Sequence, residues 1–110
     1  LKTPSTSRLS LSDALAESAA DCLWIDVRTQ EEYESGHYEG AINMPLNLLK
    51  LKSRMIKQGE SCIIYCDSGR RSEAAAYFLT EEGFNSRVVS GGINGCNASQ
   101  RLSFSYSPQA

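Results

Sequence analysis

One short segment combines a thiol nucleophile with a glycine and two arginines, a composition suited to holding an anion. It reads Cys66-Asp67-Ser68-Gly69-Arg70-Arg71-Ser72 and lies between a predicted buried strand and a predicted helix. Parallel α/β folds place their chemistry at this point, where the backbone N–H groups of a loop converge. Gly69 permits the tight turn that such a loop needs. We therefore expect Cys66 to be a nucleophile; the alternative is a buried cysteine in an ordinary strand-to-helix turn.

The charge and the donors of this loop favour the thiolate of Cys66 over the thiol. A thiolate can attack an electrophilic sulfur, and the same donors would stabilise a persulfide or a bound oxyanion. Four residues separate Cys66 from Arg71, one fewer than in cysteine phosphatases, whose loop encircles a tetrahedral phosphoryl group. The tighter ring fits a single sulfur. No second acid stands out as a general acid for phosphate release.

The elements that must position this loop are short strands alternating with helices. Strands are predicted at residues 23–27, 41–43, 62–65 and 87–89, where compact apolar or β-branched runs occur. Helices are predicted from Ser10 to about Ala20, after the capping residue Thr29 to Gly36, over 46–56 up to Gly59, and over 72–82 up to Gly83. Ser72 is expected to cap the last of these helices. This alternation indicates an α/β sandwich around a parallel sheet.

Length and composition limit the possible classes of protein. The chain has 110 residues, 41% of them apolar and 22% charged, as expected for one globular domain. A net charge of -2 provides no field that would draw the chain onto nucleic acid or an anionic membrane. The apolar runs are too short to span a bilayer, and no signal peptide is recognised. The first residue, Leu1, suggests a piece of a longer protein.

The cysteines do not follow a disulfide or metal pattern. The chain has four of them, none in a CxxC pair, and one histidine, His37. No zinc-ligand spacing is present, so neither a metal nor another cofactor is expected. Reduced thiols in the cytoplasm are the preferred interpretation.

Three stretches together resemble the rhodanese homology superfamily, over roughly residues 9–96. The order and spacing of the matching residues make the resemblance specific. Residues 1–8 are then a polar linker or leader, and residues 97–110 a divergent tail. The matching stretches are Ile25-Asp26-Val27-Arg28 through Glu32-Tyr33 and Gly36-His37 to Gly40-Ala41-Ile42-Asn43, then Tyr65-Cys66 with Ser68-Gly69 and Arg71-Ser72, then Gly83-Phe84 leading to Gly91-Gly92-Ile93.

The resemblance implies a three-layer rhodanese-like sandwich, with a parallel sheet of about five short strands flanked by helices. It also implies that Cys66 accepts sulfur as a persulfide. A small sulfur-containing anion such as thiosulfate, or a persulfide, would be the donor, and cyanide or a thiol would be the acceptor. The substrate cradle would consist of Asp67, Ser68, Gly69, Arg70 and Arg71.

Two residues depart from the family pattern. Asp67 stands where many active members have a basic residue, so thiosulfate is expected to bind weakly. Alternatively, the natural donor is a low-molecular-weight persulfide or a partner protein. Cys96 stands where the motif commonly has Trp, which indicates altered packing near the C-terminus.

Two other functions fit the same residues. The domain could be a sulfur-sensing, redox-sensing or interaction module of a larger, regulatory protein, in which Cys66 reacts without turnover. It could also be a phosphatase or arsenate reductase relative, against which the short loop argues.

Several residues outside the loop invite a chemical role but are better explained as structural. Asp26 and Arg28 follow a buried strand and are expected to form a salt bridge or loop hydrogen bonds. His37 is expected in a structural turn rather than as a general base. Cys62 shares a strand face with Cys66 and could resolve an oxidised Cys66, although buried filler is favoured. Trp24 is expected in the core.

Overall fold

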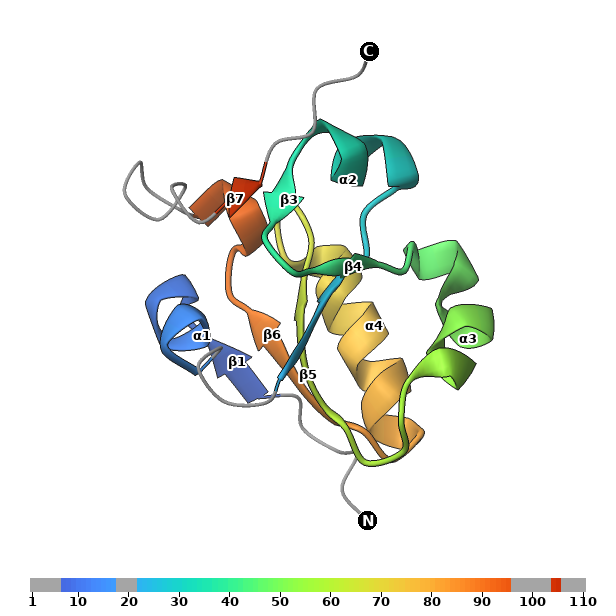
Figure 1. Cartoon of the computed structure of the whole chain (residues 1–110). Helices are drawn as coiled ribbons and strands as arrows, with labels where there is room; N and C mark the ends of the chain where they lie inside the picture. Colours follow the sequence, from blue (N-terminus) through green and yellow to red (C-terminus); the bar gives the residue numbers. More distant parts are fainter. Residues whose placement is uncertain (1–6, 18–21, 96–103, 106–110) are drawn as a thin grey trace.

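The computed structural model describes residues 7–17, 22–95 and 104–105, and within them five parallel strands form the central sheet (Figure 1). The order is β1-β6-β5-β2-β4, and each neighbouring pair is parallel. The parallel sheet of about five short strands is thus confirmed. The strands are β1 (Ser7–Leu9), β2 (Leu23–Asp26), β4 (Ile42–Asn43), β5 (Ser61–Tyr65) and β6 (Asn85–Val89).

Helices cover both faces of this sheet (Figure 1). Helix α1 lies on one side, whereas α3 and α4 lie on the other, and α2 lies beyond the carboxyl ends of the strands. The helices are α1 (Leu11–Glu17), α2 (Gln30–Ser35), α3 (Leu49–Lys52) and α4 (Arg70–Glu81), with 3-10 turns η1 (Leu46–Leu48), η2 (Ser53–Met55) and η3 (Gly92–Gly95). None of the described helices is long and apolar enough to cross a membrane.

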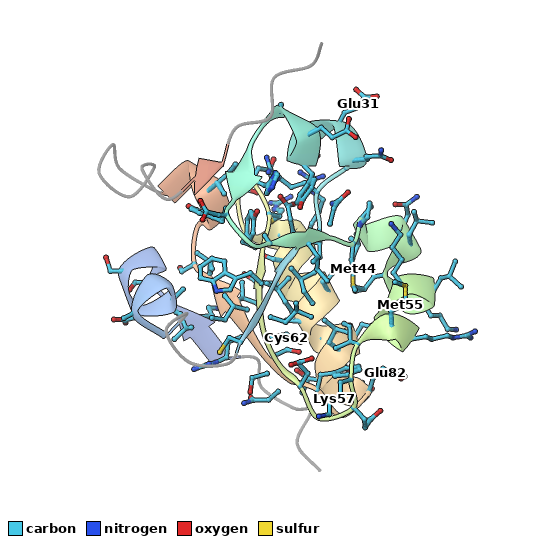
Figure 2. All side chains as sticks on the ribbon, in the orientation of Figure 1. Glu31, Met44, Met55, Lys57, Cys62 and Glu82 are labelled. Atoms are coloured by element: carbon cyan, nitrogen blue, oxygen red, sulfur yellow. The ribbon has the colours of Figure 1, made fainter. Side chains whose placement is uncertain are left out.

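The central strand β5 explains why the sheet has two cores. Its side chains alternate, so Cys62 and Ile64 enter the core under α3 and α4, while Ile63 and Tyr65 enter the core under α1. All four are fully buried. Figure 2 shows Cys62 between the sheet and α4. Cys66 follows Cys62 and Ile64 on the same side of the chain and belongs to the core under α3 and α4.

The core under α1 is aromatic. Trp24 packs with its ring centroid 5.5 Å from that of Tyr38 and 6.1 Å from that of Tyr65, which confirms Trp24 as a core residue. Tyr38 belongs to β3 (His37–Tyr38), which pairs antiparallel with β7 (Phe104–Ser105). Part of the stretch assigned to the divergent tail is therefore a strand at 104–105, and the rest of that tail lies outside the described residues.

Several boundaries differ from the sequence-based ones. Strand β1 begins at Ser7, inside the stretch assigned to the leader, because its backbone pairs with β6. The helix expected over 46–56 is three short pieces, closed by i+3 hydrogen bonds at Leu48 and Ile56. Helix α1 ends at Glu17 among the described residues, and its expected continuation at 18–20 lies outside them.

Helix α4 also begins earlier than expected, and its cap is not Ser72. Gly69 occupies the N-cap position with φ +107° and ψ -16°, a left-handed conformation that its lack of a Cβ allows. The helix therefore starts at Arg70, and Ser72 lies in its first turn. The cap of α2 is as expected, because the side chain of Thr29 accepts a hydrogen bond from the N–H of Glu32.

A buried ion pair anchors the chain where β2 ends. The guanidinium of Arg28 donates to the Asp26 carboxylate at 2.7–3.1 Å and to the Gly36 carbonyl at 2.6 Å. Asp26 is 0% exposed and Arg28 is 4% exposed. The expected structural salt bridge is confirmed. It ties the end of β2 to the turn that follows α2.

Replacing Arg28 by Leu will strongly destabilise the domain, because the Asp26 carboxylate is left buried without a counter-charge. We expect a loss of about 3–5 kcal/mol in the free energy of unfolding, measured by urea denaturation. Arg8→Leu is the control: Arg8 pairs with Glu73 at the surface, and its removal will cost less than about 1 kcal/mol. Equal losses in the two variants would contradict this account.

Candidate active site

The sulfur of Cys66 lies at the focus of hydrogen-bond donors from the loop and the first turn of α4. The backbone N–H of Gly69 points at Sγ with a distance of 3.0 Å, and that of Ser72 with 3.4 Å. The thiol in turn donates to Oγ of Ser72 at 3.3 Å, and this hydroxyl donates to the Gly69 carbonyl at 2.9 Å. These groups, together with the N-terminus of a 12-residue helix, stabilise negative charge at the sulfur.

A close approach of two backbone segments fixes the start of the loop. The N–H of Ile93 donates to the Cys66 carbonyl at 2.9 Å. Gly92 has φ +56°, and a Cβ there would lie 2.4 Å from the Cys66 carbonyl oxygen and 2.6 Å from that of Asp67. Only glycine fits such an approach. The Gly91-Gly92-Ile93 motif therefore positions the nucleophile.

Arg71, in the first turn of α4, pairs with two acidic side chains. Arg71 forms a two-fold contact with Glu32, Nη1 to Oε1 at 2.9 Å and Nη2 to Oε2 at 3.1 Å. Its Nη2 also lies 3.1 Å from Oδ1 of Asp67. The capping box of α2 holds Glu32 in place, because the N–H and hydroxyl of Thr29 both donate to Oε1. One guanidinium thus faces two carboxylates.

These contacts keep both carboxyl groups ionised. Hydrogen bonds from Arg71, assisted by those from Thr29, lower the pKa of Glu32 to about 2. Burial acts to raise the pKa of Asp67, but hydrogen bonds from Arg71 and from the N–H of Ser68 outweigh it and lower that pKa. At neutral pH the positive charge of Arg71 is therefore matched locally by two negative charges.

A pocket of about 320 Å³ opens beside this arginine. Its walls come from the segments that follow β2 and β4, at the carboxyl edge of the sheet, where parallel folds bind ligands. Arg71 connects it to the loop of Cys66. The lining residues are Val27, Thr29, Pro45, Leu46, Asn47 and Arg71.

The expected cradle residues divide into three roles. Gly69 contacts the sulfur directly, while Asp67 and Arg71 pair with each other rather than with Sγ. Ser68 and Arg70 are exposed at the rim. Within the described part of the chain, Arg70 forms no ion pair, so it is the loop cation left free for an incoming anion.

Three residues that organise the site were not predicted as site residues: Glu32, Ser72 and Gly92. Sequence reasoning treated Ser72 as a cap and the other two only as parts of a family pattern. The capping-box spacing from Thr29 to Glu32 was a usable signal for the position of that carboxylate. The partnership of Glu32 with Arg71 spans 39 residues, and no local pattern reveals it.

The other candidate residues are structural. The ring of His37 stacks on that of Tyr33 at 3.8 Å, and its Nδ1 lies 2.8 Å from the Tyr33 carbonyl. Burial raises the pKa of the Cys62 thiol to about 12, so it remains protonated. Cys22 is a free, half-buried thiol, and Cys96 lies outside the described residues. In the described part of the chain, no three His, Cys, Asp or Glu side chains gather in a way that could hold a metal ion.

Fold and site together define an α/β domain with a cysteine held in a backbone anion cradle at the carboxyl edge of a parallel sheet. The chain belongs to the rhodanese-like domain family, whose family model matches residues 9–99. This confirms the resemblance found in the sequence. Members of this family include sulfurtransferases, and sulfur transfer is the chemistry that the family supports.

Two relatives and one solved structure illustrate the similarity. The thiosulfate sulfurtransferase PspE of Escherichia coli is 36% identical over 72 residues, covering 64% of this chain and 69% of that protein. A sulfurtransferase of Allochromatium vinosum is 36% identical over 86 residues, covering 76% and 78%. A rhodanese-related protein of Thermoplasma volcanium superposes with a TM-score of 0.75 at 28% identity, covering 80% of this chain and 87% of that one.

Replacing Gly92 by Ala will destabilise the domain by forcing apart the backbone around Cys66. Gly59→Ala is the matched control, because Gly59 also has a positive φ (+81°), but a Cβ added there would meet no atom within 4 Å. In the control, backbone strain alone will lower the free energy of unfolding by about 1–2 kcal/mol. In Gly92→Ala, the clash will lower it by about 1–3 kcal/mol more. Urea denaturation measures both, and equal losses would contradict the close approach.

Glu32→Gln will reduce the sensitivity of the domain to acid. The pKa of Glu32 is depressed from 4.5 to about 2 on folding, so its contribution to stability is complete above about pH 4.5 and is lost as the pH falls towards 2. We expect the urea midpoint of the wild type to fall more between pH 7 and pH 3 than that of the variant. Glu31→Gln, on the outer side of α2 (Figure 2), should behave like the wild type. Identical pH profiles for wild type and Glu32→Gln would contradict the assignment.

Proposed function

We propose that the chain is a sulfurtransferase that carries a sulfane sulfur as a persulfide on Cys66. The observation that carries the proposal is the convergence of the Gly69 and Ser72 N–H groups on Sγ, at 3.0 and 3.4 Å. These donors stabilise the attacking thiolate. A turn of the Ser72 hydroxyl away from the Gly69 carbonyl would add a third donor to the sulfur.

The transfer takes place in two displacements. In the first, the Cys66 thiolate attacks the outer sulfur of thiosulfate, the S–S bond of the donor breaks, and sulfite leaves with the bonding electron pair. In the second, cyanide or a thiolate attacks the outer sulfur of the persulfide, and the electron pair of the broken S–S bond returns to Sγ. No external oxidant or reductant is needed. With a thiolate acceptor the sulfane sulfur keeps its oxidation state, and with cyanide the sulfur is reduced by two electrons as the cyanide carbon is oxidised to that of thiocyanate. This is nucleophilic catalysis that splits one transfer into two steps.

The charges at the entrance favour an organic persulfide over thiosulfate as the physiological donor. Arg71 is already matched by Glu32 and Asp67, so it offers little attraction to a dianion. Cys66 is fully buried, and only a slender sulfur-bearing group can approach it. The neighbouring pocket has room for the organic part of such a molecule.

We propose the cytoplasm as the compartment. Cys22, Cys62 and Cys66 are free thiols, and disulfides persist mainly outside the cytoplasm. The partners in this proposal are a small sulfur donor and a thiol or cyanide acceptor, and we include neither nucleic acid nor a membrane.

The second candidate is a sensing or interaction module of a larger protein, in which Cys66 is labelled once and does not turn over. The full burial of Cys66 favours it, because a closed site slows repeated exchange. Steady-state turnover with thiosulfate and cyanide supports the enzyme, whereas stoichiometric labelling without turnover supports the sensor.

Treatment with thiosulfate or glutathione persulfide will add the mass of one sulfur to the protein, and Cys66→Ser will not gain it. We expect transfer to cyanide by Cys66→Ser to fall to background while its urea midpoint shows that it still folds. Intact mass spectrometry and thiocyanate formation are the measurements. Cys22→Ser is the matched control and should keep both adduct and transfer. Absence of the adduct in the wild type with every donor would overturn the proposal.

A further inference from the structure

The segment η1–α3–η2 presents an unusual outer surface. Leu49, Ser53 and Ile56 are buried and hold the segment against the core. Three large apolar side chains point the other way: Leu48 is 40% exposed, Leu51 63% and Met55 82%. Figure 2 labels Met55, the most exposed of the three. We call the seven residues Leu48, Lys50, Leu51, Lys52, Arg54, Met55 and Lys57 the α3 face.

The α3 face concentrates positive charge in a chain that is acidic as a whole. Residues 40–59 contain four of the eleven basic residues and none of the thirteen acidic ones. Among the residues that the structure describes, these four cations form no ion pair. Exposed apolar side chains set among unpaired charges of one sign are typical of a surface that binds a partner of opposite charge.

The α3 face continues directly into the pocket beside Arg71. Pro45, Leu46 and Asn47 line that pocket, and Leu48 and Lys50 follow them within the same segment. Arg71 forms another wall of the pocket and belongs to the loop of Cys66. A partner seated on the face therefore has the pocket at its edge, within reach of a projecting chain end.

We propose that the α3 face docks an acidic segment of a protein whose thiol takes up the sulfur from Cys66. This inference rests on the proposed function and adds the class of acceptor. The partner thiolate attacks the outer sulfur of the Cys66 persulfide. The S–S bond to Sγ breaks, its electron pair stays on Sγ, and the partner leaves as a persulfide.

A protein explains the position of the face better than a lipid surface does. The cations would attract either, but a bilayer provides no thiol to enter the pocket. Carboxylates on the partner would pair with Lys50 and Arg54, and an apolar side chain would cover Leu51. The burial of Cys66 adds the requirement that the thiol be carried on a slender, extended part of the partner.

Two synthetic peptides test the proposal. One is rich in Glu with a single Leu and ends in Cys; the other has Lys in place of each Glu. The protein is loaded on Cys66 with thiosulfate or glutathione persulfide, and loss of the persulfide to each peptide is followed by mass spectrometry. We expect the acidic peptide to react roughly tenfold faster at low salt, and this preference to vanish at high salt.

Variants locate the effect. In Lys50→Glu/Arg54→Glu the preference for the acidic peptide should disappear, while transfer to cyanide stays at the wild-type rate. Arg8→Glu changes the same kind of charge on β1, at the opposite edge of the sheet from β4, and should keep the preference. Leu51→Gln should slow the acidic peptide severalfold without altering the salt dependence.

The outcomes separate this inference from the proposed function. Equal rates for the two peptides, in a protein that still transfers sulfur to cyanide, would overturn the docking surface alone. Failure to transfer sulfur to cyanide would overturn the proposed function itself. Binding to phosphatidylserine vesicles that needs Lys50 and Arg54, without a peptide preference, would overturn the inference in favour of a membrane. Self-association that depends on the same two residues, without that preference, would overturn it in favour of a second copy.

Discussion

The geometry of the site depends on one close backbone contact, that of Gly92 with the carbonyl groups of Cys66 and Asp67. No side chain fits between these segments, since a Cβ would lie 2.4 Å from the first carbonyl oxygen. The contact, with the Ile93 N–H bond to the same carbonyl, fixes where β5 ends and where the loop turns. Gly69 and Ser72 can then direct their N–H groups at one atom. Backbone N–H groups stay directed at the sulfur only while the backbone is held in this conformation.

A second constraint joins the loop to a distant part of the chain. Glu32 is fixed by the cap of α2, and it holds Arg71 in the first turn of α4. The end of α2 is in turn held by the buried pair of Asp26 and Arg28 through the Gly36 carbonyl. The loop therefore rests on β2 and α2 as well as on its own strand. The contact of Glu32 with Arg71 also neutralises the charge of the guanidinium. The interaction that supports the loop is therefore also one reason why the site attracts dianions only weakly.

The sequence predicts the sheet and the nucleophile well, because both depend on local composition. The runs at Leu23 and Cys62 are buried on two faces and are therefore almost wholly apolar, and the loop after Tyr65 contains its own glycine and arginines. Strand β1 escapes prediction because its three residues are paired only with β6 at the sheet edge. Partnerships such as Glu32 with Arg71 escape it too, because only the tertiary fold brings their elements together.

The extended backbone of β5 limits the redox chemistry between Cys62, which lies in the strand, and Cys66, which follows it directly. Cys62 and Cys66 point to the same side, but four residues of extended strand separate their Cα atoms by roughly 13 Å, whereas a disulfide needs them within about 7 Å. The strand is central and hydrogen-bonded on both sides, so it cannot shorten that distance. Cys62 therefore cannot serve as the resolving thiol for Cys66. A sulfenic acid at Cys66 depends on a thiol from another molecule, or from outside this strand, to return it to the reduced state.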